Sequence, residues 1–141
     1  KGRDGCRTPM TWDASLPNAG FTQGKPWLPI KAPQVANHAA AQRDNLDSVL
    51  SFYKQMLQVR RQFAELRTGD TKFFTTSEPI LAFSRADAVV CIFNLSPEAH
   101  TVAVQGVGEV IIAQGASLAQ GQLQLAGNGF VLFHDQGVVI Q

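Results

Sequence analysis

The stretch AVVCIFNL at residues 88–95 decides the fold of this chain, because it is apolar over its first six positions and then meets a turn signal. An apolar run this short, rich in β-branched side chains, predicts a central strand that is covered on both faces. Six further runs of strand character surround it, separated by breaks that carry Gly, Pro or Asn for tight turns. They are TKFFTT (71–76), ILAFSR (80–85), HTVAV (100–104), EVIIA (109–113), QLQLA (122–126) and FVLFHD (130–135).

The region from residue 67 to residue 141 therefore predicts a mainly β fold. Short strands joined by hairpin-length breaks are typical of an antiparallel β-sandwich, here with about seven or eight strands of Greek-key type. The phenylalanines of this region lack the polar handle of an exposed sugar platform, so we expect them in the core. They are Phe73, Phe74, Phe83, Phe93, Phe130 and Phe133.

One long helix is predicted before the strands, over NLDSVLSFYKQMLQVRRQFAEL at about residues 45–66. Its apolar side chains recur every three or four residues, while Lys, Arg and Gln cover the other side. We expect Asp44 or Asp47 to cap its first turn and Gly69 to end it.

The segment from residue 1 to residue 44 has no sustained hydrophobic period. Its five prolines each remove a backbone donor and fix φ, which excludes a long helix or a central strand. A long segment without such elements is usually functional or disordered, and three large aromatic side chains argue against disorder. These are Trp12, Phe21 and Trp27. We expect the segment to pack on other protein or to hold a ligand.

Charge and cysteine usage narrow the class of protein. The 12 basic and 11 acidic residues nearly cancel, so nothing suggests a nucleic-acid partner. The charged fraction of 16% is below the roughly 25% usual for soluble domains, which favours a surface that other protein normally covers. Cys6 and Cys91 make no disulfide framework and no apolar run reaches transmembrane length, so we expect a cytoplasmic protein with no membrane partner.

Two stretches carry a specific resemblance to a known family, RDGCRTPMTWDASLPNAGFTQGKPW (3–27) and DSVLSFYKQMLQVRR (47–61). They closely resemble the α-glucosidase and oligo-1,6-glucosidase branch of the family thirteen glycoside hydrolases, the α-amylase superfamily. There the first stretch follows the last strand of a (β/α)8 barrel and walls the sugar site, and the last barrel helix runs into a C-terminal β domain. The resemblance implies that residues 1–66 are a remnant of the catalytic barrel and residues 67–141 the C-terminal β-sandwich.

The acidic residues do not form a recognisable catalytic pair. A retaining glycosidase needs two facing carboxyl groups, one of them kept protonated, whereas the acids here stand mostly at turns, helix ends and strand edges. The resemblance places the nucleophile and the acid/base on absent barrel strands, so we expect no catalytic residue here and an inactive fragment. No cofactor and no metal are expected, since the histidines and cysteines lack ligand spacing.

Arg3 is the candidate substrate-binding residue. A guanidinium fork fits a pair of sugar hydroxyls, although residue chemistry alone would also allow a solvated charge beside Asp4. The resemblance implies that Arg3 helps to bind the sugar ring at the −1 subsite of an α-glucoside oligosaccharide. Arg7 is the second candidate, but we favour a structural role in which its guanidinium bonds loop carbonyls. Thr11 stands where the family usually has Pro or Gln.

The leading hypothesis is the C-terminal part of an α-glucosidase that acts on terminal bonds of short α-glucosides and retains configuration. A sucrose isomerase or a trehalose-forming transglycosidase is the alternative parent. An independent carbohydrate-binding module, or a purely structural β module, is the alternative for the strands. In the leading hypothesis the partners are the sugar and the missing barrel, and the uncovered apolar surface predicts self-association of the fragment.

Overall fold

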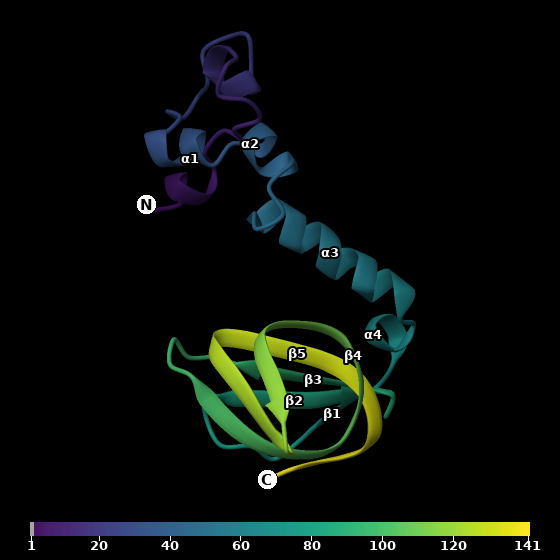
Figure 1. Cartoon of the computed structure of the whole chain (residues 1–141). Helices are drawn as coiled ribbons and strands as arrows, with labels where there is room; N and C mark the ends of the chain where they lie inside the picture. Colours follow the sequence, from purple (N-terminus) through teal and green to yellow (C-terminus); the bar gives the residue numbers. More distant parts are fainter. Residues whose placement is uncertain (1) are drawn as a thin grey trace. The chain divides into compact units, whose positions relative to one another are not determined.

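The computed structural model describes residues 2–141, which fall into two compact units. The first unit runs to Leu57 and the second begins at Gln58, so the boundary lies inside a helix. Short helical turns make up the first unit, and the second is mostly strand (Figure 1). No helix in the described residues is long and apolar enough to cross a membrane.

The first unit contains four short helical elements joined by turns. Two are 3-10 turns, η1 at Asp4–Cys6 and η2 at Pro17–Gly20, and two are single-turn α-helices, α1 at Ala32–Ala36 and α2 at Ala39–Arg43. Prolines lie in the first turn of η2 and of α1, where the absent N–H is not needed. The prediction of no long helix before residue 45 is confirmed for residues 2–44, which the structure describes.

The long helix is shorter than its sequence pattern predicts. Helix α3 spans Val49–Gln62, and a separate turn of helix, α4, spans Glu65–Thr68. Capping by Asp44 or Asp47 was the wrong expectation, because Ser48 accepts the Ser51 N–H on its side-chain oxygen at 3.1 Å. Asn45 keeps Asp47 outside the helix, since its side-chain oxygen takes the Asp47 N–H at 3.0 Å.

The strands of the second unit form one antiparallel sheet, in the order β1-β2-β3-β5-β4. Their bounds are Thr71–Phe73 for β1, Ile80–Arg85 for β2, Val89–Asn94 for β3, His100–Ala119 for β4 and Gln122–Ile140 for β5. The predicted mainly β class is confirmed. The strand count differs, because the runs HTVAV and EVIIA belong to one continuous strand and QLQLA and FVLFHD to another.

The two long strands bend over the core and turn the single sheet into a sandwich (Figure 1). Leu123 of β5 pairs with Val102 near the start of β4 and also with Leu118 near its end. The second half of β5 lies between β3 and the middle of β4, where Val131 pairs with Ile92 and Ala113. Repeated register shifts along β4 allow this bend, as bulges increase twist locally.

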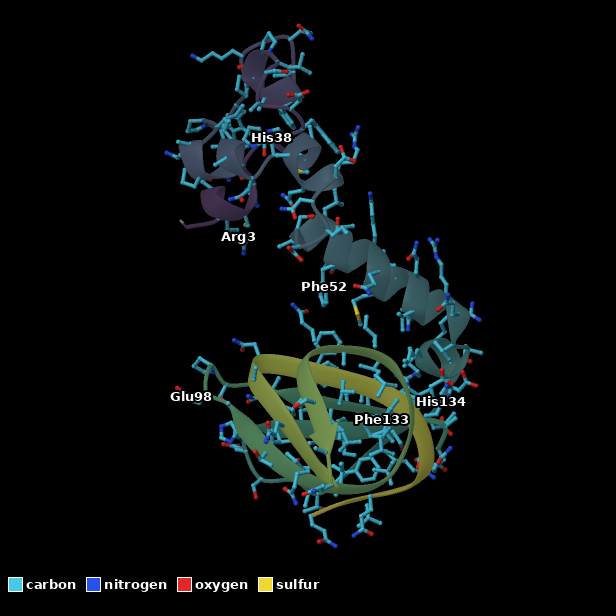
Figure 2. All side chains as sticks on the ribbon, viewed as in Figure 1. Arg3, His38, Phe52, Glu98, Phe133 and His134 are labelled. Carbon is cyan, nitrogen blue, oxygen red and sulfur yellow. The ribbon has the colours of Figure 1, made fainter. Side chains whose placement is uncertain are left out.

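The core lies between the two layers. Strand β3 is central, as AVVCIF predicts: Val90 and Ile92 face the core, while Val89 and Cys91 are buried on the other face. Phe133 is among the largest side chains in the interior (Figure 2). The core cluster consists of Ala82, Val90, Ile92, Val102, Val104, Leu123, Leu125, Val131 and Phe133.

The expectation that the phenylalanines lie in the core is only partly correct, because Phe130 and Phe133 are buried and Phe74 packs against the core, whereas Phe73, Phe83 and Phe93 lie outside it. A row of four rings crosses β1, β2, β3 and β5 on the sheet face opposite to Phe133, with neighbouring ring centroids 5.8–5.9 Å apart. Phe73 at its end is 71% exposed. The cause is the period of two along a strand, which puts each of these residues next to a core-facing neighbour. The row consists of Phe73, Phe83, Phe93 and Phe130.

Candidate functional site

Arg3 lies at the start of the η1 turn, at the rim of the first unit (Figure 2). Its carbonyl oxygen accepts the Cys6 N–H at 3.3 Å and the Cys6 thiol at 3.0 Å. The N–H of Arg7 closes the same turn by donating to the Asp4 carbonyl at 3.1 Å. The turn therefore fixes the backbone of Arg3 through main-chain bonds and leaves its side chain exposed.

The guanidinium groups of Arg3 and Arg7 make no hydrogen bond or salt bridge to any other residue that the structure describes. For Arg7 this contradicts the expected side-chain bonds to loop carbonyls, because its main-chain N–H holds the turn instead. Both forks are thus available to an external partner. A planar fork with free donors suits two adjacent hydroxyls or a carboxylate.

An open cavity of about 360 Å³ lies against the η1 turn. Its charged lining residues are Asp4 and Lys31, and apolar surface comes from Leu28 and Pro29. The remaining lining residues are Gly5, Thr8 and Gln34. A hollow with a few polar groups on an apolar wall has the composition of a small-molecule site.

Gln34 joins helix α1 to the segment that follows the turn. The nitrogen of its side-chain amide donates to the Thr8 hydroxyl at 2.5 Å, and its main-chain carbonyl oxygen accepts the Thr11 hydroxyl at 2.8 Å. The side-chain oxygen of Gln34 accepts the Lys31 N–H at 3.1 Å. Sequence reasoning missed Gln34, and the only local signal was the unusual Thr11.

A second contact ties helix α2 to the same loop. The N–H groups of Ala39 and Ala40 donate to the carbonyls of Thr11 and Trp12, at 3.0 and 2.9 Å. The ring of His38 caps α2 by accepting the Ala41 N–H at 3.3 Å, which gives this histidine a structural role. Both short helices therefore hold the segment around Thr11.

Asp13 begins a turn beside this segment. Its carboxylate accepts the Ser15 N–H at 2.9 Å and the Ser15 hydroxyl at 2.8 Å, as expected for an Asx turn. These two bonds lower the pKa of Asp13, and the nearby His38 and Arg43 add to the effect. A carboxyl with a lowered pKa stays ionised at neutral pH, so Asp13 is not suited to act as a general acid.

The large aromatic side chains of the loop are exposed within this chain. Trp27 is 88% exposed, and Trp12 and Phe21 are about half exposed. Rings of this size rarely face water without a partner. Within residues 2–141 there is no group of three His, Cys, Asp or Glu side chains close enough together to hold a metal ion.

Comparison with known protein families assigns the first half of the chain to a catalytic domain. The model of the α-amylase catalytic domain matches residues 1–69. A probable α-glucosidase of Rhizobium meliloti (strain 1021) is 42% identical over 104 residues, which are 72% of this chain and 19% of the relative. An oligo-1,6-glucosidase of Parageobacillus thermoglucosidasius is 37% identical over 100 residues, 68% of this chain and 18% of the relative. The chain thus spans about a fifth of these relatives.

Two solved structures are similar to nearly the whole of this chain, including residues of both units. The α-glucosyl transfer enzyme XgtA has a TM-score of 0.84 at 39% identity, covering 96% of this chain and 26% of XgtA. A mutant isomaltulose synthase from Erwinia rhapontici NX5, in complex with its natural substrate sucrose, has a TM-score of 0.80 at 26% identity, covering 94% of this chain and 25% of that protein. The chain belongs to the α-amylase family of glycoside hydrolases, in the branch of the α-glucosidases and oligo-1,6-glucosidases.

Proposed function

We propose that this chain is the C-terminal part of an α-glucosidase that hydrolyses terminal α-glucosidic bonds of short oligosaccharides with retention of configuration. The free guanidinium fork of Arg3, held on a closed turn beside an open cavity, carries this proposal. In this scheme Arg3 donates to hydroxyls of the sugar ring at the −1 subsite. The loop with Trp12 and Trp27 forms a wall of the sugar site.

The carboxyl groups that break the glycosidic bond belong to barrel strands outside residues 1–141 in this proposal. One acts as nucleophile and forms a glycosyl intermediate, while the other protonates the leaving oxygen and later activates water. Asp13 and Asp87 do not suit the acid role, because hydrogen bonds from Ser15 and from Lys72, respectively, lower their pKa values. The isolated chain is therefore expected to be inactive.

In this proposal residues 1–66 are a remnant of the catalytic barrel, and residues 67–141 form a sandwich with a structural role. The catalytic-domain match over residues 1–69 supports the first part. The residue that follows α3 contacts the sheet, since the Phe63 ring meets the His134 ring edge-on at 5.5 Å between centroids. The sandwich would stabilise the last barrel helix in this way.

An independent sugar-binding module is less well supported by the geometry of the phenylalanine row. Phe83 stacks on Phe93 with an interplanar angle of 21°, and Phe93 stacks on Phe130 with an angle of 23°. Phe130 is only 6% exposed, and Phe83 and Phe93 are half-buried, so little of the row is open to a sugar ring. Phenylalanine also lacks the polar group of a sugar-binding aromatic side chain, so the row suits contact with protein better than contact with carbohydrate.

Glucosyl transfer is a second candidate for the parent enzyme, supported by the likeness to XgtA and to isomaltulose synthase. Hydrolysis and transfer share the glycosyl intermediate and differ in whether water or a sugar hydroxyl attacks it. Product analysis with maltose and sucrose separates the two candidates. Glucose as the main product supports hydrolysis, whereas new linkages or a sucrose isomer would support transfer.

The proposal is tested in the full-length enzyme that carries this chain. We expect release of 4-nitrophenol from 4-nitrophenyl α-glucoside, and none from the isolated chain. Arg3→Lys should lower kcat/KM about 10- to 100-fold, because one charge-assisted hydrogen bond contributes about 1.5–3 kcal/mol. Arg67→Lys, at an exposed position on α4, is the matched control and should leave kcat/KM within about twofold. Turnover by the pure isolated chain, or an unchanged kcat/KM for Arg3→Lys, would refute the proposal.

A further inference from the structure

Gln34 contacts the loop segment from Thr8 to Thr11 in two chemically different ways. Its main-chain carbonyl accepts the Thr11 hydroxyl, while its side-chain amide donates to the Thr8 hydroxyl. The contacts are therefore separable by mutation. Replacing the side chain removes the bond to Thr8 and leaves the bond that docks α1 onto Thr11.

The segment between these two contacts has little freedom of its own. Thr11 is only 6% exposed, and Pro9 is buried with a fixed φ and no N–H to donate. The position of Thr8 is consequently set by the Gln34 amide on one side and by Pro9 on the other. A buried hydroxyl such as that of Thr11 needs its partner, so the docking side of the segment is also fixed.

Thr8 follows directly on the turn that presents Arg3. Arg7 closes this turn through its N–H to the Asp4 carbonyl, and Cys6 holds the Arg3 carbonyl. A displacement of Thr8 therefore moves the C-terminal end of the turn. Gln34, Thr8 and Asp4 also line the same cavity, which places this contact beside the site.

We propose that the Gln34 side chain is a positioning residue for Arg3, acting through Thr8 and the closed turn. This inference rests on the proposed function, because it gives Arg3 its substrate contact. Gln34 does not touch the sugar in this scheme. It sets the distance and direction from which the Arg3 fork reaches the sugar hydroxyls.

The variants are chosen to separate positioning from general stability. Gln34→Leu removes both side-chain bonds, to Thr8 and to the Lys31 N–H. Gln34→Glu keeps both, since one carboxylate oxygen can accept the Lys31 N–H and the other can accept from the Thr8 hydroxyl. Gln55→Leu is the matched control, at an exposed glutamine on α3 in the same unit, outside residues 3–27 and without a side-chain hydrogen bond to any described residue.

Kinetics of the full-length enzyme on 4-nitrophenyl α-glucoside give the first readout. We expect Gln34→Leu to lower kcat/KM about 10-fold, mainly through KM, with Gln34→Glu within about threefold of wild type and Gln55→Leu unchanged. In an Arg3→Lys background, Gln34→Leu should cost less than about twofold, because the fork that it positions is gone. Equal losses in both backgrounds, or failure of Gln34→Glu to restore KM, would overturn the inference.

Hydrogen exchange in the same full-length enzyme gives a readout that does not depend on activity. Gln34→Leu should speed exchange of the Cys6 and Arg7 amides at least about fivefold, while Gln34→Glu and Gln55→Leu should not. Unchanged exchange in Gln34→Leu would overturn the inference. An enzyme that exchanges as expected but hydrolyses no α-glucoside would refute the proposed function and leave the Gln34 contact to the turn standing.

Discussion

Asn94, at the end of β3, is a buried polar side chain of the sandwich, and replacing it should destabilise the second unit. It is 2% exposed. Its amide nitrogen donates to the carbonyls of Glu98 at 2.6 Å and Ala126 at 2.9 Å. Its side-chain oxygen accepts the N–H and the hydroxyl of Ser96, both at 3.1 Å. All four bonding positions of the amide are used.

The magnitude follows from the groups that Asn94→Ala leaves without partners. These are the Ala126 carbonyl and the Ser96 N–H, since the Glu98 carbonyl keeps the Ser96 hydroxyl at 3.2 Å. At about 1 kcal/mol for each group, the lower end of the range, the free energy of unfolding should fall by about 2 kcal/mol. In a unit of this size each kcal/mol shifts Tm by about 4–8 °C, so Tm should fall by about 8–16 °C.

Asn94→Asp sharpens the test because it changes only the donor. The introduced carboxylate would face the Glu98 and Ala126 carbonyl oxygens at the distances that the amide nitrogen now occupies. Burial and this repulsion would raise its folded-state pKa above about 3.9, the value of an unfolded Asp. The folded state then binds the proton more readily. The added destabilisation is therefore full at pH 7 and shrinks as pH falls through the raised value.

Urea unfolding followed by far-UV circular dichroism measures these differences in the β signal. The matched control is Gln124→Ala, at an exposed β5 position, which should stay within about 0.5 kcal/mol of wild type. We expect Asn94→Asp to be less stable than Asn94→Ala at pH 7, with the gap narrowing at pH 4. Stability of Asn94→Ala within about 0.5 kcal/mol of wild type, or an Asn94→Asp gap independent of pH, would refute the reasoning.

Two further predictions concern a glycine and the thiols. Gly127→Ala should lower the free energy of unfolding in urea by at least about 2 kcal/mol, because its Cβ would lie 2.0 Å from the Pro97 carbonyl oxygen. Gly24→Ala is the control, since its Cβ would come no nearer than 3.9 Å to the Thr22 hydroxyl, and an equal loss there would contradict the reasoning. Burial raises the pKa of Cys91 to about 11, so only about one molecule in 10⁴ carries a thiolate at pH 7. A maleimide should therefore label the exposed Cys6 alone in the native chain, as read by mass spectrometry, and labelling of Cys91 before unfolding would count against its burial.

Much of the sandwich could be predicted because burial on both faces is visible in local composition. AVVCIF contains no polar residue, and β3 is central in the sheet. The merging of four expected strands into β4 and β5 could not be predicted from the same signals. A glycine at a bend within a strand, such as Gly106 or Gly115 with positive φ, looks in the sequence like a glycine at a turn between strands.

The candidate site, too, could be predicted from the sequence only in part. Arg3 could be singled out from its motif, because the motif is local, but the η1 turn that holds it was not predicted. The bonds of Gln34 to Thr8 and Thr11 span 26 and 23 residues, and such separations leave no pattern in the sequence. The prediction of which residue caps α3 was wrong for a related reason. Asp47 and Ser48 are both good caps by residue type, and the Asn45 side chain decides between them.

The double pairing of the start of β5 also limits how the sheet can associate with foreign strands. Residues 122–125 have a neighbour on each side, both supplied by β4, so they offer no unpaired main-chain groups to an incoming strand. At the opposite end the outermost strand, β1, is only three residues long and carries the charged Lys72. Short, charged edges are poor templates for strand addition. Strand addition at β1 or at the start of β5 is therefore disfavoured.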